Sequence, residues 1–412
     1  MATTGYGTPE SRQQATLGGL KVLELGQLLA GPFAGCLMAD LGADVIHIED
    51  PGSGDPSRKL GPPKDDTYLW WKVSGRNKRS VTLDLRNPDG QEVARRFVKW
   101  ADVVITNIRV GTLEKWGLDW PSLHAVNPKL VVLQVSGYGA TTTKKNAPGF
   151  GKVGEARSGL VHITGFPDGP PVHAGFSHAD TITGLMGAFA IQCAMYRRLT
   201  DPDYDGEWID LAVDETLFRL VEWQVVIYDQ LGVIPERIGN GIPGSPSSVV
   251  NAFKASDGRW ITITSGNVRT VQNIAMLVGE PIEDYASLPL IATNRPHLEE
   301  MIAKWIGNHT TEECQAEMDR AGVVAAPVLN VADIVADDTY RERGNIVTVD
   351  DPDVGPLRMQ GVVPRLANHT GHVWSAAPEL GQHNEEVYKG VLGMTDAEYE
   401  SLVASGLIGA PG

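Results

Sequence analysis

The order of apolar and polar positions predicts the elements of the first half of the chain. Short runs rich in Val, Ile and Leu alternate there with segments of helical periodicity, which indicates repeated strand–helix–strand units. Parallel strands need crossover helices, so we expect a doubly wound α/β fold with a parallel sheet. The predicted strands are 20–26, 44–49, 80–85, 102–108 and 130–139, and the intervening helices include 30–43 and 89–101.

The pattern changes after the fifth predicted strand. Residues 139–178 are rich in Gly, Pro and Thr and are predicted to form loops. A long helix is expected to start at Asp180, and because it is apolar on most faces we expect it to be buried. A strand at 207–213 and a helix at 214–232 should follow.

The remaining segments differ in texture from this α/β part. Residues 1–18 are polar, lack the apolar stretch of a secretory leader, and are predicted to be a disordered tail. Residues 250–330 mix strands and helices without regular alternation, which predicts a smaller α+β domain. Two domains suit a chain of 412 residues.

Composition narrows the classes of partner. The chain has 35 basic and 51 acidic residues, a net charge of −16, which disfavours nucleic acid and anionic membrane surfaces as main partners. Its cysteines, Cys36, Cys193 and Cys314, form no CxxC pair, so neither a disulfide framework nor a zinc site is predicted. No apolar run approaches membrane-spanning length. We therefore expect a cytoplasmic location.

The first strand–helix turn reads LGQLLAGP at 25–32 rather than GxGxxG, which disfavours a nicotinamide or flavin dinucleotide. Two other groups of residues could hold phosphates. A glycine-rich GYG follows a strand at 137–139, which by itself is a weak signal. Basic side chains near strand ends suit phosphates, although charge runs more often form solvated turns, and they are Arg76, Lys78, Arg79, Arg109 and Lys115.

Asp180 is the candidate for covalent chemistry. It opens the long helix, where aspartate is also a common cap. The positive end of a helix favours an ionised carboxylate, as a nucleophile requires. His173 and His178 lie nearby, but no GxSxG nucleophile and no HxxxH or HExxH metal pattern accompanies them. We interpret them as loop histidines.

Eight stretches resemble the class III CoA-transferases, the family of formyl-CoA transferase and carnitine CoA-transferase. They run in family order over nearly the whole chain: 20–58, 75–90, 101–118, 136–139, 179–189, 206–218, 322–334 and 377–388. The resemblance implies an interlocked, ring-like homodimer. It also implies a Rossmann-like large domain over 19–205 that is completed by 340–412, a linker over 206–249 and a small α+β domain over 250–330.

The same resemblance implies a reaction. Asp180, in the frame GFSHADTITGL, matches the family's nucleophilic aspartate. The chain would move CoA from an acyl-CoA to a free carboxylic acid through a mixed anhydride and an aspartyl-CoA thioester. No metal or other cofactor is expected, because each step exchanges one activated acyl group for another.

The family motifs also imply which residues contact substrates. A substrate loop corresponds to GNGIPGSPS at 239–247, with Gly239, Gly241 and Gly244, although Ile242 and Pro243 interrupt the family's glycine run. The implied CoA contacts are Leu29, Ala30, Arg76, Asn77, Lys78, Arg79, Asn107, Ile108, Arg109, Lys115, Ser136, Gly137 and Tyr138.

Departures from the family pattern bear on the substrate. Leu29 stands where formyl-CoA transferase has glutamine, and Asp50 where it has arginine, which argues against the formate–oxalate pair. The frame at 146–165 is closer to members that use succinyl-CoA with dicarboxylic acids.

Two alternatives remain open. The α-methylacyl-CoA racemases share this fold and use a GHD histidine, where this chain has Gly149, Phe150 and Gly151. Phenylalanine cannot exchange a proton, which disfavours racemisation. A non-enzymatic CoA-binding protein is the other alternative.

Overall fold

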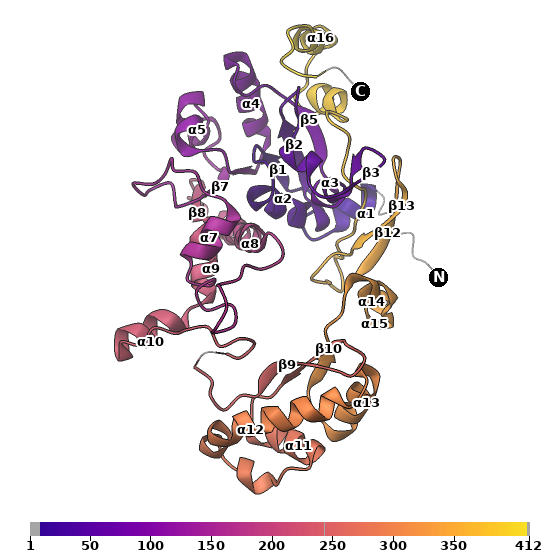
Figure 1. Cartoon of the computed structure of the whole chain (residues 1–412). Coiled ribbons are helices and arrows are strands. Elements are labelled where there is room, and N and C mark those ends of the chain that lie inside the picture. Colours follow the sequence, from indigo (N-terminus) through magenta and orange to yellow (C-terminus); the bar gives the residue numbers. More distant parts are fainter. Residues whose placement is uncertain (1–8, 243, 410–412) are drawn as a thin grey trace. The chain divides into compact units, whose positions relative to one another are not determined.

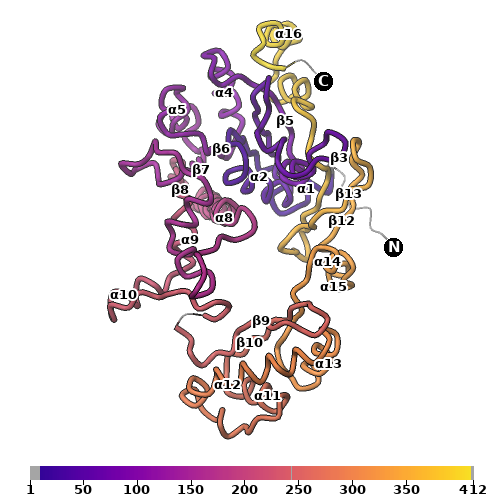
Figure 2. The backbone as a smooth tube through the Cα atoms, in the orientation of Figure 1, coloured from indigo at the N-terminus to yellow at the C-terminus, as the bar shows by residue number. Residues whose placement is uncertain are grey.

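The computed structural model describes residues 9–242 and 244–409. These residues form two compact units, and unit 1 combines the chain up to Ser158 with Ala174–Leu220 and the chain from Thr339 onward. Unit 2 combines Gly159–His173 and Val221–Asp338. The chain therefore passes from unit 1 into unit 2 and back twice, along the course traced in Figure 2.

A six-stranded sheet forms the centre of unit 1 (Figure 1). All five strand pairings are parallel, in the order β5-β2-β1-β6-β7-β8. By chain position this order is 3-2-1-4-5-6, that of the doubly wound dinucleotide-binding folds, and its direction reverses between β1 and β6. The strands are β1 Lys21–Glu24, β2 Asp44–Glu49, β5 Arg79–Thr82, β6 Val103–Thr106, β7 Val131–Ser136 and β8 Glu207–Ala212. The predicted parallel α/β architecture is thus confirmed.

Helices cover both faces because successive strand residues point to opposite sides. Val104 and Val132 pack into a core with Phe97 of α4 (Pro88–Trp100). On the other side, α2 (Ala30–Asp40) lies against α8 (His178–Thr200) at a close crossing. A Cβ on Gly184 of α8 would lie 2.9 Å from the Ala30 carbonyl oxygen, so glycine allows this approach.

The C-terminal part of unit 1 returns to the sheet edge beside β5. Asn384 Oδ1 accepts the Thr82 N–H at 2.9 Å, and the Tyr388 hydroxyl donates to the Thr82 carbonyl at 2.7 Å. The other elements of unit 1 are α1 Pro9–Gln14, η1 Pro56–Lys59, β3 Pro63–Lys64, β4 Thr67–Tyr68, α3 Leu69–Ser74, α5 Val110–Trp116, α6 Trp120–Val126, α7 Gly151–Arg157, α9 Val213–Leu220, β12 Ile346–Asp351, β13 Gly355–Gln360, the π-helical η3 Glu386–Val391 and α16 Asp396–Ala404. Helix α15 (Asp338–Glu342) spans the boundary between the units.

Unit 2 contains a three-stranded antiparallel sheet in the order β11-β10-β9. Its apolar core joins the inward side chains of the sheet to three helices. The elements are α10 Trp223–Leu231, β9 Val250–Lys254, β10 Trp260–Thr264, α11 Val268–Val278, η2 Ile282–Tyr285, α12 Leu288–Gly307, α13 Thr311–Ala321, β11 Ala325–Pro327 and α14 Val331–Ala336.

Several local predictions differ from the structure. Part of the expected disordered tail forms α1, because Arg12 donates hydrogen bonds to the carbonyls of Ala43 and Asn77; residues 1–8 lie outside the described residues. Helix α7 lies within the predicted loop region. Helix α8 is buried along one side only, and Cys193 on it is exposed.

No helix in the described part of the chain is long and apolar enough to cross a membrane. Within residues 9–242 and 244–409, no group of three or more His, Cys, Asp or Glu side chains could hold a metal ion.

Candidate active site

A cavity of about 510 Å³ lies at the carboxyl ends of β1, β6 and β7 in unit 1. In open parallel sheets, ligands bind where the strand order reverses, and β1 and β6 flank that point here. The segments after these strands form the cavity wall, together with α7 and the first turn of α8. The position alone therefore marks this cavity as the candidate active site.

Asn107 joins the two segments at the reversal point. Its Oδ1 accepts the Gln27 N–H at 2.8 Å, and its Nδ2 donates to the Gln27 carbonyl at 2.7 Å. Gly26 permits this contact, since a Cβ there would lie 3.0 Å from Asn107 Oδ1. The two strand ends that flank the cavity are thus held at a fixed spacing.

Asp180 projects into the cavity from the first turn of α8. Burial raises the pKa of Asp180 to about 6; the nearby Glu155 carboxylate adds to the rise, and the Lys152 cation opposes it. The helix N-terminus favours the ionised form, yet burial has the larger effect. At pH 7 the ionised form therefore still predominates, although burial has removed part of the water that would stabilise its charge.

Gly151, the first residue of α7, lies directly against the Asp180 carboxylate. A Cβ at this position would lie 2.9 Å from Asp180 Cγ and closer still to Oδ2. The preceding Phe150 lines the cavity but is 68% exposed. The side-chain-free surface of Gly151 therefore fixes where the carboxylate can lie.

Lys152 connects α7 to the segment that leads into α8. Its Nζ forms an ion pair with Glu155 at 3.0 Å and donates hydrogen bonds to the carbonyls of Ala174, at 2.6 Å, and Phe176, at 3.1 Å. Glu155 is only 1% exposed. This arrangement orders the approach to Asp180 and places opposite charges beside it.

The structure brings eight of the predicted site residues together around this cavity. They are Leu29, Ala30, Asn107, Ile108, Arg109, Ser136, Gly137 and Asp180. Tyr138, in contrast, lies outside the lining, where its hydroxyl donates to the Pro148 carbonyl. Lys115 is exposed in the last turn of α5, also outside the lining.

The basic turn at 76–79 lies away from the cavity lining, and its charges are used within the fold. Arg76 and Asn77 both donate to the Asp40 carboxylate. Lys78 pairs with Glu24 at 2.8 Å, and Arg79 pairs with Asp44 and Glu386. Contact between these side chains and CoA stays a prediction.

Gly239, Gly241 and Gly244 belong to unit 2, so the structure does not relate them to the cavity. Pro243 of this predicted substrate loop lies outside the described residues. His178 begins α8, and its ring lies 5.2 Å from that of Phe176, while His173 is exposed. Neither histidine lines the cavity.

Sequence reasoning missed Gln27, Lys152 and Glu155 as cavity residues or neighbours of Asp180. Lys152 and Glu155 are three residues apart, which is a helical spacing. The surrounding glycines and prolines indicate a loop, so the sequence did not predict α7, which carries both residues.

Comparisons with known proteins identify the family of this chain. The sequence profile described as CoA-transferase family III matches residues 17–384. Succinyl-CoA--D-citramalate CoA-transferase from Chloroflexus aurantiacus is 39% identical over 404 residues, covering 96% of this chain and 99% of the relative. Succinate--glutarate CoA-transferase from Agrobacterium fabrum is 31% identical and covers 92% of this chain and 96% of its own length.

A solved structure shares the fold of this chain. The crystal structure of a CAIB/BAIF family protein from Brucella suis superposes with a TM-score of 0.79 at 32% sequence identity. The match covers 92% of this chain and 99% of that chain. The profile matches most of the chain, and the relatives align along almost their whole lengths. The protein therefore belongs to CoA-transferase family III and is a class III CoA-transferase.

Proposed function

We propose that the protein transfers CoA from succinyl-CoA to a dicarboxylic acid, with Asp180 as the covalent nucleophile. The observation that carries this proposal is the Asp180 carboxylate, partly buried and held against Gly151 in the cavity at the strand-order reversal. The named activities of the Chloroflexus and Agrobacterium relatives support the substrate class.

The proposed reaction balances without any cofactor. The Asp180 carboxylate attacks the thioester carbonyl, CoA leaves as thiolate, and a mixed anhydride forms. The thiolate then attacks the aspartyl carbonyl of the anhydride, which releases the donor acid and leaves an aspartyl-CoA thioester. The acceptor carboxylate repeats both steps in reverse and regenerates Asp180. A poorly hydrated carboxylate suits this role, since less water must be displaced before attack.

CoA contacts are proposed for the wall residues that surround Asp180. Leu29 and Ala30 begin α2, Asn107 and Ile108 follow β6, and the exposed Arg109 offers a guanidinium at the same edge. An anionic phosphate chain would lie favourably beside that guanidinium. These placements continue the expectation from the family motifs.

Racemisation is the second candidate, and the cavity disfavours it. A racemase needs proton donors on both sides of an α-carbon. Phe150 and Gly151, which occupy the place of the racemase GHD triplet, carry no exchangeable side-chain proton and line the cavity next to Asp180. Incubation with acyl-CoA in D₂O should therefore leave the α-position unlabelled.

Trapping tests the covalent proposal directly. During turnover with succinyl-CoA, hydroxylamine should convert Asp180 to a hydroxamate, and borohydride should reduce it, each detected by peptide mass analysis. Asp180→Asn should lose both the modification and the transfer while still binding CoA. Asp203→Asn, at an exposed turn, is the matched control and should keep both. Turnover without modification at Asp180 would contradict the mechanism.

A further inference from the structure

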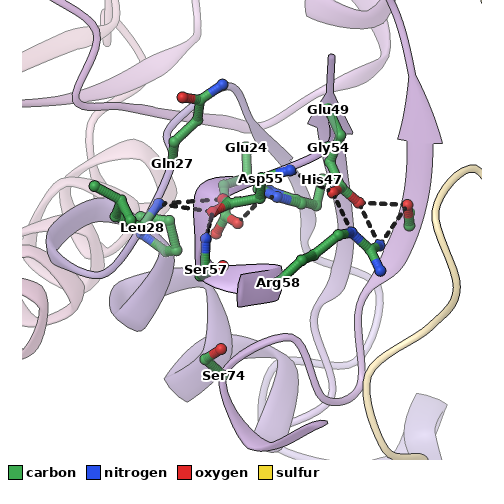
Figure 3. A network of polar contacts seen from close by, with 12 residues as sticks. Glu24, Gln27, Leu28, His47, Glu49, Gly54, Asp55, Ser57, Arg58 and Ser74 are labelled. Carbon is green, nitrogen blue, oxygen red and sulfur yellow. Dashed lines mark hydrogen bonds and ion pairs between the residues drawn. The ribbon is translucent and has the colours of Figure 1, made fainter. Parts of the chain in front are cut away.

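A row of buried charges crosses the sheet beneath the cavity wall (Figure 3). Glu24 at the end of β1 faces His47 of β2 in the strand register. His47 Nδ1 lies 2.6 Å from Glu24 Oε1, and its Nε2 lies 3.2 Å from Asp55 Oδ2. All three residues are at most 2% exposed, so the histidine joins two carboxylates in the interior of the unit.

The row continues on the far side of Glu24. Lys78 Nζ donates to both Glu24 oxygens, at 2.8 and 3.0 Å, and to the Pro32 carbonyl at 2.8 Å. Two carboxylates therefore alternate with two basic groups, and the row is neutral when His47 is protonated. Burial by itself lowers the pKa of His47, but the charge of Glu24 and the contact with Asp55 outweigh it and raise the pKa to about 9.

Asp55 connects this row to the cavity wall. Both of its carboxylate oxygens accept the Leu28 N–H at 3.1 Å, and Oδ1 also accepts the Ser57 N–H at 2.7 Å. Figure 3 shows Leu28 to the left of Asp55 and His47 to its right. The row thus ends on the backbone of a residue that lines the cavity.

Leu28 has a backbone conformation that needs such support. Its φ is +64°, in the left-handed region that leucine rarely adopts. On one side, Gln27 is fixed to Asn107, and on the other side Leu29 and Ala30 begin α2. A relaxed Leu28 would rotate the peptide planes of the wall segment Gln27–Ala30.

We propose that His47 is a positioning residue of the active site, which holds Asp55 against the Leu28 backbone and so shapes the wall that receives acyl-CoA. His47 does not line the cavity itself, and in this proposal it acts through Asp55. The inference rests on the proposed placement of acyl-CoA in this cavity, but not on the covalent intermediate. A histidine that merely satisfies the core would instead affect stability alone.

A double-mutant cycle between His47 and Leu28 tests this role. His47→Gln breaks the bridge between the carboxylates. It should raise KM for succinyl-CoA about tenfold, with kcat changed less than about threefold. Leu28→Gly adopts the same φ without strain, so in that background His47→Gln should change KM by less than about threefold.

The core variant Val98→Ala, buried away from the cavity, provides a control for lost stability. Assays are run at temperatures equally far below each variant's unfolding midpoint. If His47→Gln does not fold, Asp55→Asn replaces it, because the amide oxygen can still accept the Leu28 N–H while the charge pair with His47 is lost.

Equal KM values for His47→Gln and Val98→Ala would overturn the proposal, as would an undiminished His47→Gln effect in the glycine background. An unchanged KM in Leu28→Gly alone would support the proposal, because glycine keeps the backbone conformation of the wall. Trapping at Asp180 would succeed or fail independently of all three results.

Discussion

Asp180 combines two opposing requirements, since a nucleophile must be ionised and burial disfavours its charge. Its raised pKa of about 6 places the change of charge within reach of kinetic experiments. Below this pKa the carboxyl is protonated and cannot attack, so kcat/KM should fall about tenfold per pH unit as the pH decreases below about 6. Above it, kcat/KM should reach a plateau.

The fall of kcat/KM at low pH is the acid limb of the pH profile. The charges beside Asp180 should shift the pH at which this limb begins, each in a direction that follows from its sign. Glu155 raises the pKa of Asp180, so Glu155→Gln should shift the limb to lower pH. Lys152 lowers it, so Lys152→Met should shift the limb to higher pH, and Lys152→Arg, which keeps the charge, should not. The measurement is kcat/KM for succinyl-CoA against pH.

The exposed Lys304→Met serves as a remote charge control. The substrate's own ionisation is common to all variants, so the displacement between their limbs reports on the enzyme. If kcat/KM fell at the same pH in all variants, the group whose protonation lowers kcat/KM would not be Asp180.

Gly151 offers a test of geometry without a change of charge. Alanine suits the first turn of a helix better than glycine does, but its Cβ would meet the Asp180 carboxylate. Gly151→Ala should therefore reduce kcat about 10²-fold through misplacement of the nucleophile, with little loss in the unfolding temperature. Gly307→Ala, where a Cβ would meet nothing within 4 Å, is the control and should retain activity. Normal kcat in Gly151→Ala would mean that Asp180 can move freely.

At the scale of elements, local pattern predicted most of the sheet and failed where tertiary contacts decide. The run at 102–108 forms β6, which is apolar on both faces as expected for a buried parallel strand. The run at 44–49 forms β2, where the buried His47 and Glu49 pair with other charged side chains. Helix α7 was missed because its glycines indicate a loop, although Gly151 and Gly154 are small to fit Asp180 and Val213. The sequence carries no local signal for such a fit.

One helix boundary in unit 2 differs from the sequence prediction. The sequence predicts a helix near 295–307, which would put Pro296 in its first turn. The structure instead has α12 starting at Leu288, capped by the Ser287 side chain, with Pro296 inside the helix. Pro296 has no backbone N–H to donate within the helix. The capping hydrogen bond and the burial of Ile291 and Leu298 stabilise α12 by more than this loss costs.

The crossing of α2 and α8 leads to a prediction at this scale. Gly184→Ala would place a Cβ 2.9 Å from both the Ala30 carbonyl oxygen and Phe33 Cβ, so the helices must separate. We expect a loss of roughly 2 kcal/mol in the free energy of unfolding, and a higher KM for acyl-CoA because Ala30 lines the cavity. Denaturant unfolding and steady-state kinetics measure both effects.

Gly390→Ala, also within a helical segment but with no atom within 4 Å of the added Cβ, should leave both values unchanged. If Gly184→Ala were less stable but had an unaltered KM, the distance between α2 and α8 would not affect acyl-CoA binding.

At the scale of the whole molecule, the candidate site could be predicted only in part. The family motifs located Asp180 and the segments after β1, β6 and β7, because these are short contiguous runs. The ion pairs of Arg76 and Lys78 were not predicted, since their partners Asp40 and Glu24 are distant in sequence and the same basic cluster suits phosphates. The spacing of basic residues along a chain does not distinguish a cation buried in an ion pair from a cation that binds a ligand.

The homodimer remains a prediction, and α8 supports it. Leu185, Phe189, Tyr196 and Leu199 share one side of this helix at helical spacing and are 53–83% exposed in the single chain. An apolar stripe of this kind in water marks an interaction surface. We expect the double variant Phe189→Glu and Leu199→Glu to shift the mass in light scattering from dimer to monomer. Val363→Glu, an isolated exposed apolar site, should remain dimeric.

Subunit exchange distinguishes interlocked chains from docked ones. Two docked subunits can separate without unfolding, so differently tagged dimers should form hybrids at the rate of dissociation. Interlocked chains must first open one ring, which requires partial unfolding, so hybrids should form only at the rate of that unfolding. We therefore expect no hybrid over hours in native buffer, and hybrids after joint denaturation and refolding. Rapid native exchange would leave the dimer in place but exclude interlocking.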